Sequence, residues 1–182
     1  LSMSLLMTPD MANFTGNVHG GTLLKLLDEV AYACASRYSR RYAVTLSVDR
    51  VIFREPIRVG ELLILSASIN HTGRTSMEVG IRVETENIHS GIRRHTNSCY
   101  FTMVAVDERG APTAVPPLAP RTLEEKQRME AARLRRELRQ DGLDEGVAAV
   151  EARGGRIVVG QLLCYLRHLE PGDDLVILHK GR

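Results

Sequence analysis

The feature that most constrains this chain is a stretch at residues 21–39 that is apolar on every side of a helix. Its apolar positions are Leu23, Leu24, Leu26, Leu27, Val30, Ala31, Ala33, Cys34 and Ala35. A helix that is hydrophobic all round is buried rather than laid on a surface. The sequence therefore predicts a fold built around one central helix.

After this helix, apolar residues recur with a period of two, which is typical of strands. Four segments show the pattern, and turn sequences separate them: residues 44–54, 62–70, 75–86 and 92–107. In the first segment Val44, Leu46 and Val48 alternate with Thr45, Ser47 and Asp49. Such alternation gives a strand one packed face and one wet face, as an antiparallel sheet requires.

The order of the elements, one helix and then strands joined by short hairpins, favours an α+β fold over βαβ units. An antiparallel sheet that curls round the helix would bury it. One sheet covers only part of the circumference of a helix, so we expect a second subunit to close the rest. The lead-in at residues 1–12 is expected to hold one helical turn at residues 4–7.

The C-terminal third has a different composition and divides the chain into residues 1–120, 121–140 and 141–182. Residues 121–140 predict a charged helix, which Thr122 and Glu125 would begin as a capping box. Residues 141–155 are acidic and contain glycines, as in a linker. The apolar runs in residues 156–182 predict a small β-α-β appendage.

Composition excludes several classes of function. The net charge of +2 and the 4% of aromatic residues argue against a nucleic-acid-binding surface. No apolar run is long enough to span a membrane, and residues 1–7 lack the basic region of a signal peptide. The three cysteines form no CxxC pair, so we expect no disulfide framework, no structural zinc site and a cytoplasmic location.

Asp28 lies two turns into the apolar helix, where an ionised carboxylate is costly unless it is paired or functional. A buried carboxylate can act as a general base that activates water, or as a nucleophile. The alternative is an aspartate that pairs with an arginine, in which case the reactive acid is Glu29 or neither residue.

The loop before the helix, residues 13–21, is polar and contains glycines. Gly20 and Gly21 stand at the helix N-terminus, where free N–H groups favour a developing oxyanion; a tight turn that needs positive φ would also explain them. Asn13 has an amide that can orient a water or a carbonyl oxygen, or simply form an Asx turn. His19 is either a base or a structural residue, and no His/Cys cluster indicates a metal site.

A second candidate binding segment is the run Gly73, Arg74, Thr75 and Ser76, between the second and third expected strands. A cation beside hydroxyl groups can hold a phosphate. An ordinary hairpin turn would have the same composition.

Several motifs, in this order, resemble the hotdog-fold acyl-CoA thioesterases, the group of the cytosolic acyl-CoA hydrolases and their bacterial relatives. The resemblance runs from about Met7 to Pro117. Its motifs are Asn13-x-x-Gly16-Asn17-Val18-His19-Gly20-Gly21, Leu27-Asp28-Glu29, Phe53-x-x-Pro56-x-x-x-Gly60, Gly73-Arg74-Thr75-Ser76-Met77 and Phe101-Thr102-Met103-Val104-Ala105-Val106-Asp107.

The resemblance implies a five- or six-stranded sheet wrapped round the helix, with a charged C-terminal helix after it. It implies dimers joined edge to edge and assembled into hexamers, which hydrolyse fatty acyl-CoA to CoA and a free fatty acid. No cofactor is implied beyond the CoA of the substrate, and a nucleotide effector is compatible with the group.

The resemblance also assigns roles to residues. Asp28 would be the base or nucleophile, with Glu29 as the alternative acid, and Asn13 would come from the other subunit. The amide near Gly20 or Gly21, beside His19, would polarise the thioester. The segment 73–76 would lie along the pantetheine and phosphates of CoA.

Two other functions are alternatives to hydrolysis. A non-catalytic hotdog module would bind acyl-CoA without turnover, usually with a DNA-binding segment attached, for which residues 1–12 are too short. A hotdog dehydratase or hydratase would need a histidine and an acid in its own motif, whereas His19 lies in the thioesterase-like loop.

Overall fold

The computed structural model describes residues 1–49, 51 and 55–152, with side-chain environments as far as Arg139. The chain forms two compact units, Leu1–Ala119 and Pro120–Arg182. The first unit contains the sheet and the central helix.

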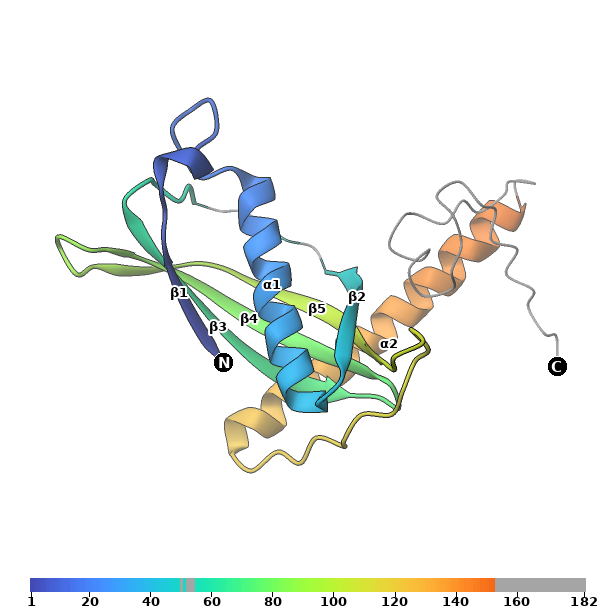
Figure 1. Cartoon of the computed structure of the whole chain (residues 1–182). Coiled ribbons are helices and arrows are strands. Elements are labelled where there is room, and N and C mark those ends of the chain that lie inside the picture. Colours follow the sequence, from blue (N-terminus) through green and yellow to red (C-terminus); the bar gives the residue numbers. More distant parts are fainter. Residues whose placement is uncertain (50, 52–54, 153–182) are drawn as a thin grey trace, which may run out of the picture. The chain divides into compact units, whose positions relative to one another are not determined.

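The first unit is a five-stranded antiparallel sheet with one long helix across it (Figure 1). The strands are β1 (Ser2–Leu6), β2 (Tyr42–Val48), β3 (Glu61–Thr72), β4 (Ser76–Asn87) and β5 (Arg93–Val106), and the helix is α1 (Gly20–Ser39). Their order in the sheet is β1-β3-β4-β5-β2, so β1 and β2 are its two edges. The expected α+β hotdog architecture is confirmed.

The core forms between α1 and the helix-facing side of the sheet. Large side chains there are almost completely buried, among them Leu27, Val30, Leu63, Leu65, Val79, Phe101 and Met103. Residues of β3, β4 and β5 that alternate along each strand meet the buried stripe of the helix, because successive side chains of a strand point to opposite faces.

The prediction of a helical turn at residues 4–7 was wrong. Residues Ser2–Leu6 form β1, which pairs with β3 from Ser2↔Ser66 to Leu6↔Leu62. A 3-10 turn, η1 (Pro9–Met11), follows it. The segment is too short to hold a conformation by itself, and the unpaired edge of β3 supplies the backbone partners that make it a strand.

The first expected strand, residues 44–54, forms as β2 only to Val48, and residues 52–54 lie outside the described part of the chain. A β-bulge between Thr45 and Ser47 also breaks the simple alternation. Thr45 stands opposite the core residue Met103 and so faces the helix, while Val44 stands opposite Val104 on the other side.

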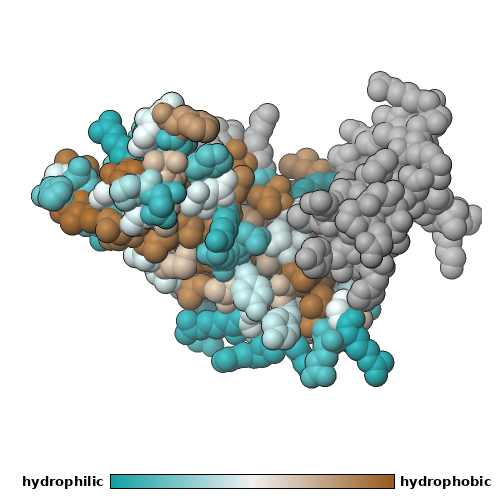
Figure 2. Space-filling model, turned by 45° about the horizontal axis from the view of Figure 1, so that its top comes forward, coloured by the Kyte–Doolittle hydropathy of each residue, from teal (hydrophilic) through white to brown (hydrophobic). Residues whose placement is uncertain are grey.

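Helix α1 has an open side in the single chain, as expected if one sheet covers only part of the helix. Leu24 and Tyr32 are 40% and 41% exposed, and on the edge strand Tyr42 is 68% exposed. A cavity of about 370 Å³ lies between Tyr32, Ser36 and Tyr42. Figure 2 shows hydrophobic patches between hydrophilic ones on the visible surface. We call the side of α1 that carries Leu24 and Tyr32, together with β2, the open face.

The second unit begins with α2 (Leu123–Ala152). The predicted capping box is present, since Glu125 N donates to Thr122 Oγ1 (3.1 Å) and Thr122 N donates to Glu125 Oε2 (3.0 Å). Two backbone N–H groups, those of Arg121 and Thr122, hold the pKa of Glu125 below its usual value. The helix runs 12 residues past 140, so most of the expected linker at 141–155 is helical. The appendage expected at 156–182 lies outside the described residues.

No helix in the described ranges is both long enough and apolar enough to cross a membrane.

Candidate active site

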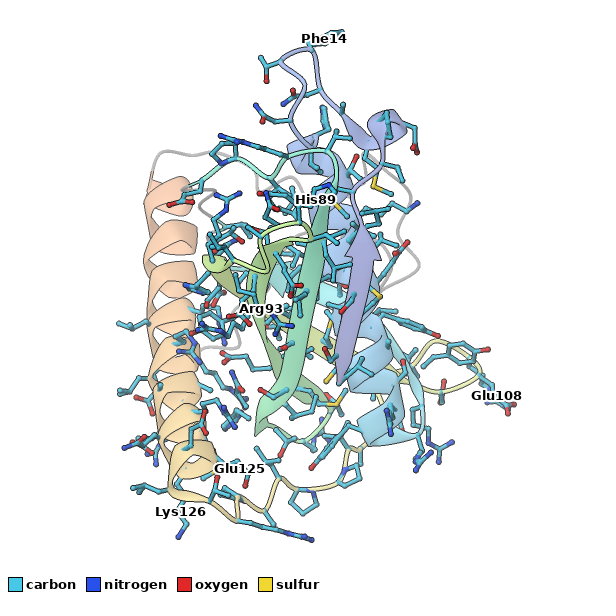
Figure 3. All side chains as sticks on the ribbon, turned by 90° about the vertical axis from the view of Figure 1, so that its left-hand side faces the viewer. Phe14, His89, Arg93, Glu108, Glu125 and Lys126 are labelled. Carbon is cyan, nitrogen blue, oxygen red and sulfur yellow. The ribbon has the colours of Figure 1, made fainter. Side chains whose placement is uncertain are left out.

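The loop before α1 is a small closed turn. Ala12 and Val18 form a β-bridge, Asn13 N donates to Asn17 O at 2.6 Å, and Gly16 N donates to Asn13 O at 3.0 Å. Gly16 has φ = +79°, which a residue with a side chain rarely adopts. These backbone contacts close the loop on itself. At its tip, Phe14 is fully exposed and points away from the rest of the unit (Figure 3).

The side chain of Asn13 is oriented by this loop. Its Oδ1 accepts hydrogen bonds from Thr15 N (2.9 Å), Thr15 Oγ1 (2.7 Å) and Asn17 N (3.2 Å). Asn13 thus forms the Asx turn that was predicted as its alternative role. Within the described residues, the Nδ2 group of Asn13 has no acceptor, so the oriented amide still has its donor group free for a ligand.

His19 is the N-cap of α1, and its Nδ1 accepts a hydrogen bond from Gly21 N at 2.9 Å. The imidazole must be unprotonated at Nδ1 to accept this bond. Neither Gly20 nor Gly21 has a positive φ. The reason for glycine at 21 is space, because a Cβ there would lie 3.0 Å from His19 Nδ1.

These contacts separate the two glycine amides that were candidates for an oxyanion site. The Gly21 amide is already used by His19. The Gly20 amide has no acceptor among the described residues, as expected for the first turn of a helix. Gly20 is therefore the better candidate to stabilise negative charge on a ligand.

Asp28 lies on the open face and is exposed in the single chain, so the prediction that it is buried was wrong for one subunit. Its Oδ1 accepts a hydrogen bond of 2.5 Å from Thr45 Oγ1 on the edge strand β2. The neighbouring acid, Glu29, is exposed and forms only an ion pair of 3.8 Å with Lys25, one helical turn away.

Thr45 is a candidate site residue that the sequence did not reveal. It lies 17 positions after Asp28, and a threonine in a strand gives no signal of its own. The hint available was its place in the strand that directly follows the helix, because sequential elements are usually adjacent in space.

The predicted site residues do not meet in one chain. Asp28 is eight residues beyond Gly20, so the two lie about 12 Å apart along the axis of α1. An aspartate and a helix N-terminus at that separation cannot act on the same small group. One chain therefore presents two separate candidate half-sites: Asn13 in the loop and Gly20 in the first turn of α1 form one, and Asp28 with Thr45 beside the sheet edge forms the other.

The segment 73–76 is the turn between β3 and β4, at the far end of α1. Gly73 N donates to Ser76 O (2.8 Å), as in a hairpin, and Arg74 O accepts from Val115 N (3.0 Å). The next residue, Pro116, accepts a hydrogen bond from Tyr38 in the last turn of α1 (3.2 Å). Within one chain this turn lies far from Asn13.

The other reactive side chains are weaker candidates for catalysis or metal binding. Burial raises the pKa of Cys99 to about 12 and also raises the pKa of Cys34, so neither thiol is a nucleophile near neutral pH. In the part of the chain that the structure describes, no group of three or more His, Cys, Asp or Glu residues could hold a metal ion.

Comparison with protein families gives a match at residues 15–92 to the model of the thioesterase superfamily. The chain is 54% identical to Protein VdlD of Helicobacter pylori, over 78% of this chain and 81% of the relative. It is 37% identical to the cytosolic acyl coenzyme A thioester hydrolase of Rattus norvegicus over 71% of this chain, but spans only 34% of that longer protein.

Solved structures show the same likeness. An apo-hexameric acyl-CoA thioesterase superimposes with a TM-score of 0.76 at 40% identity, over 79% of this chain and 92% of the other. The acyl-CoA hydrolase of Staphylococcus aureus, solved with butyryl coenzyme A and coenzyme A, gives a TM-score of 0.76 at 28% identity, over 85% and 94% of the two chains.

The Staphylococcus aureus enzyme has also been solved with an asparagine, an aspartate or a threonine changed to alanine. In that enzyme the aspartate follows the asparagine by 15 positions and the threonine follows the aspartate by 17. Asn13, Asp28 and Thr45 have the same residue types at the same spacing. The matching residues come from both candidate half-sites, and Thr45 is one of them.

Proposed function

This chain belongs to the thioesterase superfamily, among the hotdog-fold acyl-CoA thioesterases, and from that premise we propose which residues form its active site and which subunit supplies each of them. The protein is an acyl-CoA thioester hydrolase that releases CoA and a free fatty acid. We propose that each active site is built from two subunits: Asp28 and Thr45 from one, Asn13 and Gly20 from the other. The observation that carries the proposal is the Asp28–Thr45 hydrogen bond at a site whose spacing from Asn13 matches that of the Staphylococcus aureus enzyme.

The open face supports this division. Among the described strands, β2 pairs with β5 alone, so its other edge can pair with a second β2. Two identical strands related by a two-fold axis pair antiparallel, which reverses the direction of the partner's helix. The N-terminus of the partner's helix then lies toward the C-terminal half of this one, and the partner's loop can approach Asp28. The exposed Leu24, Tyr32 and Tyr42 would be covered in the same step.

The chemistry follows from the groups in each half-site. The Asp28 carboxylate removes a proton from water, and the resulting hydroxide adds to the thioester carbonyl. The N–H of Gly20 donates to the oxyanion while Asn13 Nδ2 donates to the carbonyl or holds the water. When the tetrahedral intermediate collapses, the carbon–sulfur bond breaks and the proton on Asp28 passes to the CoA thiolate.

Direct attack by Asp28 on the carbonyl uses the same groups. It expels CoA thiolate first and forms an acyl–aspartyl anhydride, which water then hydrolyses. In both routes Thr45 holds Oδ1 of Asp28 and leaves Oδ2 to react. We propose no cofactor beyond the CoA of the substrate.

The segment 73–76 is proposed as a CoA contact. Arg74 is exposed and beside hydroxyl groups, so it can pair with a phosphate. Because the turn lies at the C-terminal end of α1, it comes near the partner's Asn13 loop only in the two-fold dimer described above. This placement supports a substrate that runs across both subunits.

Assembly beyond the dimer and location in the cell are also proposals. Hexameric relatives include the apo thioesterase and a thioesterase of Yersinia pestis, which supports a hexamer of this chain. The relative from Rattus norvegicus is named cytosolic, which supports a cytoplasmic protein. A nucleotide effector stays a prediction.

The test of the function is release of CoA from a panel of straight-chain acyl-CoAs of increasing length, followed with a thiol-reactive dye. We expect turnover with at least one acyl length, and the profile of kcat/KM then defines the chain-length preference. Tight binding of every acyl-CoA without release of CoA would instead identify a non-catalytic binding module.

Replacement of Thr45 with valine is expected to lower kcat by about 10- to 100-fold. The change removes a hydrogen bond to a charged group, worth about 1.5–3 kcal/mol, and each 1.36 kcal/mol corresponds to a factor of ten. Thr45→Ser keeps the hydroxyl and should retain most of the activity. Steady-state kinetics with the best acyl-CoA would decide, and equal rates for the valine and serine variants would contradict the role of Thr45.

A further inference from the structure

We propose that Arg94 is a positioning residue for the active-site loop, although it lies on β5 and contacts no part of that loop. It would act by fixing the segment 55–61, against which residues 17 and 18 are hydrogen-bonded. The inference rests on the proposed role of Asn13 and adds to it the group that holds Asn13 in place.

Arg94 makes an unusual number of bonds for a residue of a strand. Its Nη2 donates to Glu61 Oε1 (2.8 Å), Glu61 Oε2 (2.9 Å) and Pro56 O (3.1 Å), and its Nη1 donates to Glu55 Oε2 (2.6 Å). Its partners are 33 to 39 positions away in sequence. One guanidinium group thus holds both ends of the segment 55–61.

Glu61 also bonds the middle of the segment. Its Oε2 also accepts from Arg58 N at 2.9 Å, so the carboxylate closes the turn from inside. The side chain of Glu61 is only 10% exposed. The hydrogen bonds that Arg94 donates to Glu61 hold the pKa of Arg94 above its usual value, so the guanidinium group stays charged.

The segment 55–61 in turn holds the loop. Val18 N donates to Ile57 O at 2.8 Å, and Asn17 forms a β-bridge with Arg58. Asn17 then exchanges two hydrogen bonds with Asn13: Asn13 N to Asn17 O (2.6 Å) and Asn17 N to Asn13 Oδ1 (3.2 Å). A continuous set of short contacts therefore leads from Arg94 to the amide of Asn13.

The geometry explains why an arginine is suited to this position. Its planar fork bonds acceptors on three residues at fixed angles, whereas the ammonium group of a lysine is a point charge on a flexible stem. Within one subunit the loop has its bridge to residues 57 and 58 on one side and the exposed tip at Phe14 on the other. Small displacements of a positioned group cost catalysis heavily, about 100-fold for a shift near 1 Å.

The first test compares Arg94→Met with Arg93→Met, its matched control. Arg93 is the adjacent residue of β5; its side chain is 62% exposed and forms an ion pair with Glu86. We expect Arg94→Met to lower kcat by about 10- to 100-fold and Arg93→Met to leave it unchanged. Arg94→Lys should give an intermediate loss. Equal activities of the two methionine variants would overturn the proposal.

The second test asks whether Arg94 acts through Asn13. Arg94→Met and Arg94→Lys are each introduced into the wild-type chain and into the Asn13→Ala chain. If Arg94 only positions the loop, the loss seen in the wild type should disappear in the Asn13→Ala background. A residue that merely supports the fold would cause the same proportional loss in both, and that result would refute the role. If Arg94→Met does not fold, as circular dichroism would show, Arg94→Lys carries both tests.

The outcomes also separate this inference from the proposed function. Full activity of Asn13→Ala would remove the role of Asn13, and with it the proposed composite site. Loss of activity in Asn13→Ala while both Arg94 variants stay fully active would leave the composite site intact and exclude only the role of Arg94.

Discussion

Asp28→Asn is expected to lower kcat by about 100- to 10,000-fold, because it removes the only group in the half-site that can take a proton from water or attack the carbonyl. The amide still accepts the hydrogen bond from Thr45, so the geometry of the open face should persist. Asp28 is exposed in the single chain, and surface substitutions usually change stability by less than about 0.5 kcal/mol. KM and the melting temperature should therefore change little, as steady-state kinetics and thermal unfolding would show.

The matched control is Glu29→Gln, which alters the adjacent acid on the same helix. Its ion pair with Lys25 is exposed and long, and such pairs contribute little. We expect near wild-type activity. An active Asp28→Asn together with an inactive Glu29→Gln would transfer the catalytic role to Glu29, and full activity of both would exclude a carboxylate mechanism on this helix.

Mixing two inactive variants should restore activity. In a dimer of one Asn13→Ala chain and one Asp28→Asn chain, one of the two sites receives Asn13 and Asp28 from unaltered positions and the other receives neither. Random exchange of equal amounts places about half of the dimers in this mixed state, so about a quarter of the wild-type activity should return. Each variant alone should remain far below that level.

The mixture must be made by unfolding and refolding the two chains together, or by expressing them together, so that subunits exchange. A mixture prepared without exchange is the control and should stay inactive. If co-refolding gives no more activity than the sum of the two variants, Asn13 and Asp28 act within the same chain and the shared site is wrong.

The parts of the fold that were predictable depend on local chemistry. The apolar run from residue 21 predicted the bounds of α1 to within one residue. A long apolar run that ends in charged residues indicates both where a helix begins and where it ends. The box of Thr122 and Glu125 likewise predicted the start of α2. Turn residues placed the hairpins before β4 and β5.

The parts that failed depend on partners distant in sequence. Strand β1 exists because β3 offers an edge, and the pairing of Thr45 with the core residue Met103 of β5 places Thr45 on the helix side of β2. The burial of Asp28 was inferred from its apolar neighbours, but one face of the helix is left without a cover in a single chain. The sequence predicted that one sheet would leave part of the helix uncovered, but it did not show that Asp28 lies on that part.

The free edge of β2 has a consequence for how the enzyme would behave on dilution. If each site needs two chains, the number of working sites follows mass action, and activity per chain becomes a measure of association. Folding of the core and completion of the site are then separate equilibria, because the core lies between α1 and the sheet whereas the site lies across the edge. A chain can thus be fully folded and still contribute no turnover until it meets a second copy.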